Sequence, residues 1–278
     1  MGNWIEGDRQ KRFFCQILGL ISSELPKTPT GDQLQAIALA IPHISEAATI
    51  WHQWIDDKLL IRVFEGLGWF YEGQGAYVQA EIWLEEGLKI IQNRFDYNHP
   101  YMAEILENLA SLNQLKDCHK KSIVLAKASL EMNRGLYSGD HHSIASSLNT
   151  LATAYQLQEQ YEEAESLYRS ALSMLRRLFG DKHPNIASNL NNIAALHQLQ
   201  GHYEEAKPLL LEALYMLQDI YGEEHPYIAS SLMNLARLYN LQERYGEAGS
   251  LFLDAFEMRI KLFNGMHYSV SDSRAISF

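Results

Sequence analysis

The sequence repeats itself with a period of 42 residues, and this period constrains the fold more than any other feature. A histidine marks the period at His99, His141, His183, His225 and His267, and it is followed by proline in three of these places. Counting back one step from His99 gives Asp57, so five full units are predicted: 57–98, 99–140, 141–182, 183–224 and 225–266. Units of this length stack side by side, and each contacts chiefly its neighbours.

Each unit is predicted to be a helical hairpin, because apolar residues recur at spacings of three, four and seven. In unit 183–224 one apolar face precedes a break at 200–202 and another follows it: Leu190, Ile193 and Ala194, then Ala206, Leu210 and Ala213. The unit is therefore read as helix A, a tight turn and helix B. Proline suits the first position of a helix, so the preceding histidine is predicted at or next to the N-cap.

Small and large residues alternate in a way that resembles the tetratricopeptide repeat (TPR). Unit 183–224 carries Leu190-x-x-Ile193-Ala194, then Tyr203-Glu204-Glu205-Ala206 and a further alanine seven residues later. With the 42-residue period, these phrases are similar to the units of kinesin light chains. The resemblance covers about three-quarters of the chain. It implies an all-α fold, a right-handed superhelical α-solenoid of stacked TPR hairpins, whose concave surface is lined mainly by the A helices and binds peptides.

Both ends of the chain lie off this pattern. Residues 1–56 are predicted to form an N-terminal helical cap, a degenerate hairpin kinked at Pro42, because proline removes a backbone donor. Residues 267–278 are predicted to be a truncated helix A or a short cap. Whether the chain is a fragment of a longer protein is left open. Self-association through the ends of the solenoid is also left open.

Charge and cysteine content exclude several classes of partner and site. With 23 Lys and Arg against 34 Asp and Glu, the net charge is −11, which opposes binding to nucleic acid or anionic membranes. Cys15 and Cys118 are too few and too far apart for a disulfide framework or a zinc site. The sequence shows no signal peptide and no apolar run of membrane-spanning length. A cytoplasmic protein is predicted.

Searches for catalytic chemistry give no candidate. Phosphate-binding loops, dinucleotide-binding glycines and the common hydrolase motifs are absent. Pairs of glutamates occur at 85–86, 162–163, 204–205 and 223–224, and they are interpreted as residues of helix B starts or exposed turns. Stacked histidines about 8–10 Å apart cannot share a metal ion. The protein is therefore predicted to be non-enzymatic, with no catalytic residue, cofactor or metal.

The candidate binding residues lie on helix A, opposite its packed side. Amides recur there at Asn108, Gln114, Asn149, Gln156, Asn191, Asn192, Gln198, Asn234 and Asn240. Amides both donate and accept, so a ladder of them can bind the backbone of an extended peptide. In the family that the chain resembles, equivalent asparagines line the groove. The alternative is that these amides are solvated or pack between helices.

Charged and aromatic residues complete the predicted groove. Trp69 is interpreted either as a groove anchor or as a residue that packs against the cap. The acidic N-terminal end carries Glu65, Glu72, Glu104 and Glu107, and the basic C-terminal end carries Arg237 and Arg244. The predicted function is a scaffold that binds an extended peptide or protein partner in this groove. The alternative is a sensor or regulatory segment of a larger signalling NTPase.

Overall fold

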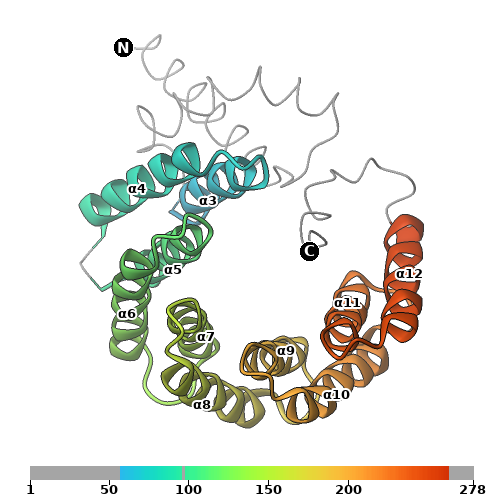
Figure 1. Cartoon of the computed structure of the whole chain (residues 1–278). Coiled ribbons are helices and arrows are strands. Elements are labelled where there is room, and N and C mark those ends of the chain that lie inside the picture. Colours follow the sequence, from blue (N-terminus) through green and yellow to red (C-terminus); the bar gives the residue numbers. More distant parts are fainter. Residues whose placement is uncertain (1–56, 96–97, 263–278) are drawn as a thin grey trace, which may run out of the picture. The chain divides into compact units, whose positions relative to one another are not determined.

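The computed structural model describes residues 57–95 and 98–262, and within them the chain forms ten α-helices and no strand (Figure 1). The all-α prediction is confirmed. The predicted cap with its kink at Pro42 and the predicted segment 267–278 lie outside the described residues, and the five unit boundaries stay a prediction. The chain divides into two compact units, which among the described residues cover 57–95 with 98–118, and 119–262.

The helices alternate between A and B helices along the chain. In the first unit they are α3 (Asp57–Gly73), α4 (Tyr77–Arg94) and α5 (Pro100–Leu115). In the second unit they are α6 (His119–Leu136), α7 (His142–Gln156), α8 (Tyr161–Phe179), α9 (Pro184–Leu199), α10 (Tyr203–Tyr221), α11 (Pro226–Leu241) and α12 (Tyr245–Leu262). Within the second unit the A helices α7, α9 and α11 contact one another on one side of the layer, and the B helices lie on the other (Figure 1).

Each repeat histidine within the described residues is an N-cap. The Nδ1 atoms of His99, His141, His183 and His225 accept a hydrogen bond, at 3.1–3.3 Å, from the backbone N–H two residues later. Each ring also stacks on an aromatic ring four residues earlier, with centroids 3.5–4.2 Å apart: Phe95, Tyr137, Phe179 and Tyr221. The first N–H groups of a helix have no partner inside it, and the imidazole supplies one. The predicted capping role of the histidine is confirmed.

One residue in each hairpin turn adopts a left-handed conformation. Glycine fills this position twice, at Gly75 and Gly201, with φ of 70° and 78°. The equivalent position in the other three turns is not glycine: Asp117, Glu159 and Glu243, with φ of 56–60°. Glycine reaches such φ values without steric cost, whereas other residues do so with strain. The turn geometry is therefore held by the packing of the hairpin and not by glycine alone.

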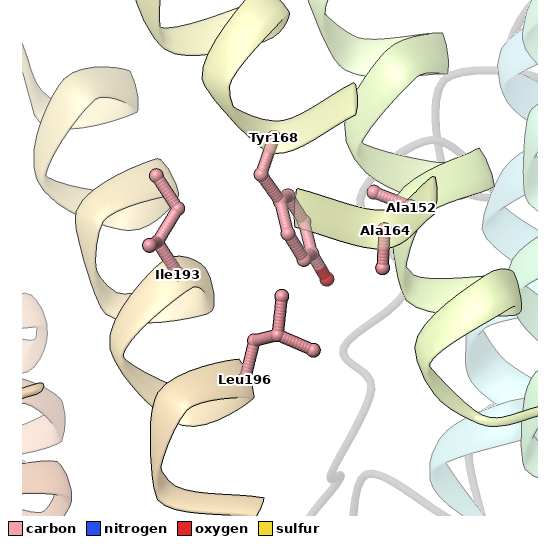
Figure 2. Close-up of a cluster of buried hydrophobic side chains, with 5 residues drawn as sticks. All are labelled: Ala152, Ala164, Tyr168, Ile193 and Leu196. Atoms are coloured by element: carbon pink, nitrogen blue, oxygen red, sulfur yellow. The ribbon is translucent and has the colours of Figure 1, made fainter. Parts of the chain in front are cut away.

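Small residues allow the helices of a hairpin to approach closely, and large ones fill the space between hairpins. Tyr168 of α8 is 1% exposed and packs with Ala152 of α7 and with Ile193 and Leu196 of α9 (Figure 2). Its hydroxyl group hydrogen-bonds to Thr153 Oγ1 at 2.8 Å and to Gln156 Oε1 at 3.2 Å. Burial raises the pKa of Tyr168 to about 12, so the hydroxyl remains a neutral hydrogen-bonding group.

The repeat 57–98 solves the same packing problem with different residues. Phe64 stands where the other repeats have leucine, and Gly87 stands where they have serine or alanine. A Cβ atom on Gly87 would lie 2.7 Å from the Phe64 ring, which is closer than any real contact. The larger ring on α3 is thus accommodated by the missing side chain on α4.

Ion pairs cross the boundaries between repeats in the second unit. They join Asp140 to Arg177, Lys182 to Asp219, and Glu224 to Lys261. In every case a residue just before the histidine cap contacts a residue near the end of the next B helix. The sign reverses from each boundary to the next: the first partner is acidic, then basic, then acidic.

Candidate functional site

The exposed side of α7, α9 and α11, called the A-helix face below, is almost free of charge. These three helices contain no Asp, Glu or Lys, and Arg237 is their only arginine. The B helices α8, α10 and α12 carry acidic residues in their first turns, and α6, α8 and α12 carry basic residues in their last turns. The A-helix face therefore offers amide and hydroxyl groups to a partner, with one guanidinium group.

Several of the predicted amides link neighbouring A helices. Asn189 donates a hydrogen bond to Asn149 between α9 and α7, and Asn191 donates to Ser231 of α11 at 3.2 Å. In the first unit Asn108 donates to Glu65 at 2.8 Å. For these positions the interpretation of asparagine as an inter-helix packing residue is supported.

The side chains of two predicted glutamines are bonded to a neighbouring helix or buried. Gln156 accepts the hydrogen bond from Tyr168, and Gln198 is only 6% exposed. The Nε2 atom of Gln198 and the Oδ1 atom of Asn191 are both buried and have no hydrogen-bond partner in the described part of the chain. Asn189 Oδ1 and His197 Nδ1, also on α9, are buried and unpaired in the same way.

Asn192 and Asn234 occupy equivalent positions on α9 and α11. Both are half-buried, and neither side chain has a hydrogen bond among the residues that the structure describes. Arg237 lies three residues after Asn234 and is exposed, with no ion pair to a described residue. Surrounding protein lowers the pKa of its guanidinium group by desolvation. Asn240, in the last turn of α11, is exposed.

The first unit holds the remaining predicted residues, Trp69 and Gln114, of which Trp69 is 37% exposed. One of its acidic residues, Glu65, behaves differently from the prediction. Glu65 is 4% exposed, and burial together with the neighbouring Glu104 raises its pKa to about 8, against the opposing hydrogen bond from Asn108. Glu65 is therefore largely protonated at neutral pH, so the acidic character expected of this region is reduced.

Two other predictions about charge are wrong. Arg244 was expected to make the end of the groove basic, but it pairs with Glu247 and lies 4.3 Å over the ring of Tyr239, so its charge is neutralised. The pair Glu85-Glu86 was expected at a helix start or turn, but it lies in the middle of α4. The first residue of that helix is Tyr77, eight residues earlier.

Sequence reasoning missed a buried polar column on the A helices. Ser147, Asn189 and Ser231 have no exposed surface and stand at equivalent positions of α7, α9 and α11. Ser147 hydrogen-bonds to Ser129 of α6 at 3.0 Å and accepts from Asn133 at 2.9 Å. The signal was a polar residue recurring in three consecutive repeats, where the first two repeats have Val63 and Ile105.

Residues 57–95 and 98–262 contain no group of three or more His, Cys, Asp or Glu residues placed to hold a metal ion. None of the described helices is both long enough and apolar enough to span a bilayer.

The tetratricopeptide repeat family model matches residues 101–177, 151–219 and 185–261, which together make up more than half of the chain. The chain belongs to the tetratricopeptide repeat family. No curated protein matches its sequence.

Solved structures with the same fold include TPR-like repeats of a kinesin light chain from Podosopora anserina, with a TM-score of 0.56 and 23% identity over 73% of this chain and 96% of that one. BtubC (BKLC) from P. vanneervenii has a TM-score of 0.61 and 23% identity over 84% and 92%. NprR in complex with its cognate peptide NprX has a TM-score of 0.62 and 17% identity over 91% and 69%. The expected TPR fold of the kinesin light chain type is confirmed.

Proposed function

We propose that this protein is a non-enzymatic interaction module whose A-helix face binds an extended peptide segment of a partner protein. The binding surface is formed by α7, α9 and α11 in the second unit. The cytoplasmic location expected from the sequence is part of the same proposal.

The half-buried amides of Asn192 and Asn234 carry this proposal, because both are partly exposed and neither has a hydrogen bond to a described residue. Each amide can donate to and accept from the backbone of an extended peptide. Asn191 Oδ1 and Gln198 Nε2 also have no partner among the described residues, but both atoms are buried, so they do not contribute to this surface.

The surrounding surface supports the same partner. Arg237, three residues after Asn234 on α11, is exposed and can pair with a carboxylate of the peptide. A face without acidic residues or lysine imposes few charge requirements on the rest of the segment. Among proteins of the same fold, NprR is known in complex with the peptide NprX, and a Rap protein in complex with Competence and Sporulation Factor.

The test begins with selection of peptides from a random display library on the whole protein. The double variant Asn192→Ala with Asn234→Ala is expected to bind the selected peptides roughly tenfold more weakly, with an unchanged melting temperature. Asn185→Ala, in the exposed first turn of α9, is the matched control and is expected to bind normally. Selected peptides that bind the double variant as well as the wild type would contradict the proposal.

A further inference from the structure

α12, the last described helix, has one face that is both apolar and exposed (Figure 1). Leu253, Phe256 and Ile260 are 55%, 59% and 49% exposed, and Gly249 precedes them on the same side. At 100° per residue these four positions lie within an arc of about 60°, turned by more than a right angle from the buried Ala255. This face, called the α12 seam below, is therefore separate from the packed side of α12 and from the A-helix face.

The preceding B helices are more polar at two of these positions. Leu253 corresponds to Glu85, Lys127, Arg169 and Leu211. Ile260 corresponds to Gln92, Arg134, Arg176 and Gln218. The outer face of an end repeat is normally polar, whereas α12 is more apolar than the B helices before it. An exposed apolar face of this kind marks an interaction site.

The sequence after α12 lacks the side chains that cover a B helix elsewhere in the array. Between described repeats this cover comes from the next A helix: Ile193 of α9 packs against Tyr168 of α8. The column of Ile193 and the column of Leu190 are large and apolar in all five repeats, but in segment 267–278 they hold Ser277 and Arg274. The cover for the α12 seam is therefore sought in another molecule.

The α12 seam is complementary in shape to a second copy of itself. Its residues are four, three and four positions apart, the spacing of a seam between two helices. When two copies of α12 run antiparallel with Leu253 opposite Phe256, Ile260 lies opposite Gly249 of the second copy. A Cβ atom on Gly249 would have no neighbour within 4 Å, so the isoleucine enters open space. Larger side chains occupy the position of Gly249 in the other repeats: Glu81, Ile123, Glu165 and Lys207.

Charge favours the antiparallel direction. α12 has Glu247 in its first turn and Arg259 and Lys261 in its last turn. An antiparallel pair places the acidic end of each copy beside the basic end of the other, and a parallel pair places like charges together. Glu247 and Lys261 also have ion-pair partners in their own chain, so charge sets the direction of pairing and apolar contact supplies most of the affinity.

We propose that the α12 seam is a self-association surface through which two copies of this protein form a two-fold symmetric dimer. Each copy contributes the same residues, Gly249, Leu253, Phe256 and Ile260, as an isologous contact requires. One helix from each copy gives an interface below about 1,200 Å², the size of weak complexes, so the dimer dissociates on dilution. The A-helix face takes no part in this contact, so each proposal stands or fails without the other.

Sedimentation velocity of the whole chain, from micromolar to near-millimolar concentration, tests the dimer. The wild type is expected to shift from monomer to dimer as the concentration rises. Phe256→Glu is expected to raise the dissociation constant more than tenfold, because it places two carboxylates in the apolar contact. Val124→Glu on α6 is the matched control, since Val124 is also an exposed apolar residue of a B helix, and it leaves the dissociation constant unchanged.

Gly249→Leu separates loss of association from loss of folding. Leucine is a better helix former than glycine, and the space around Gly249 is open within the chain, so the melting temperature should not fall. The same side chain fills the space that Ile260 of the second copy needs, so the dissociation constant should rise roughly tenfold.

Disulfide cross-linking tests the register of the pair in a chain that carries Cys15→Ser and Cys118→Ser. An equal mixture of Gly249→Cys and Ile260→Cys chains is expected to form a cross-linked pair under mild oxidation. Gly249→Cys alone is not, because the two copies of position 249 lie roughly 16 Å apart along an antiparallel pair.

Three results would overturn the proposal: a monomer at every concentration, an unchanged dissociation constant in Phe256→Glu, or cross-linking of Gly249→Cys with itself in place of the mixed pair. If the wild type is monomeric and Phe256→Glu speeds hydrogen exchange within residues 267–278, that segment covers the α12 seam and a second copy does not.

Discussion

The A helices of the two units have the same fold but opposite polar character. In the first unit α3 and α5 bury a carboxyl group, Glu65, against Glu104 and Asn108. In the second unit α7, α9 and α11 contain no acidic residue and are joined through Asn149, Asn189, Asn191 and Ser231.

This difference shows that the TPR scaffold fixes the apolar columns but leaves the polar columns of helix A free to vary. A carboxyl group buried between helices makes stability depend on pH, because it must stay protonated. Neutral amides do not titrate, so they form hydrogen bonds between neighbouring helices at any pH. The two units are therefore expected to respond differently to the same changes in solution.

The largest expected effect is the pH dependence of the first unit. Since the pKa of Glu65 is raised from 4.5 to about 8, the protonated carboxyl group stabilises the fold fully below pH 4.5, and this contribution is lost as pH rises through 8. In the wild type the free energy of unfolding should fall by on the order of a few kcal/mol between pH 6 and pH 9. Glu65→Gln mimics the protonated form, so this fall should be absent in the variant. Thermal unfolding at both pH values measures this.

The control for that experiment is Glu86→Gln on α4, a residue whose contact is an ion pair to Lys89. It should leave the pH dependence as in the wild type. If Glu65→Gln destabilises the protein equally at pH 6 and pH 9, the carboxyl group is ionised in the fold and the contrast between the units disappears.

A smaller effect is expected from the amides of the second unit. Asn149→Ala removes the acceptor of Asn189, which has no exposed surface, and should lower the free energy of unfolding by about 1–2 kcal/mol. Asn192→Ala removes no hydrogen bond to a described residue and should cost less than about 0.5 kcal/mol. Urea denaturation compares the two variants. Equal losses would show that both amides link helices.

The smallest effect concerns the feature that the two units share, the histidine cap. His99→Ala in the first unit and His183→Ala in the second should each cost about 1 kcal/mol, and His→Asn at either position should cost less because asparagine also caps. Chemical denaturation of these four variants measures the cost. If His→Ala lowers stability in one unit only, the two units differ in their helix caps as well as in their polar residues.

Acid should weaken one of these caps in particular. Burial and the neighbouring His142 lower the pKa of His141, so its neutral, capping form stabilises the fold above the ordinary value of 6.5, and this contribution is lost as pH falls through the lower folded value. His141→Asn should therefore lose less stability than the wild type between pH 7 and pH 5. Unfolding monitored by circular dichroism at the two pH values measures this difference.

Residues that recur in columns allowed the fold to be predicted. The period placed the caps at His99, His141, His183 and His225, and the turns at fixed distances after them. Periodicity succeeds here because each helix position meets the same neighbours in every unit.

The candidate site was predicted less completely, because the partner of a polar side chain is often not periodic. Asn149 and Asn192 look alike in the sequence, but only Asn149 is bonded to Asn189. Arg237 and Arg244 look alike too, yet Glu247 and Tyr239 neutralise Arg244. Such outcomes depend on which neighbour a side chain reaches, and the spacing of residues does not contain that information.

The ion pairs at the repeat boundaries have a consequence for the order in which the repeats assemble. Every boundary presents similar apolar columns, so hydrophobic packing alone would tolerate a unit stacked one place too far along. With one unit skipped, Asp140 would meet Asp219 and Lys182 would meet Lys261, both pairs of like charge. Because the sign alternates, like charges disfavour the stacking of a repeat on the wrong neighbour, and opposite charges favour the correct one.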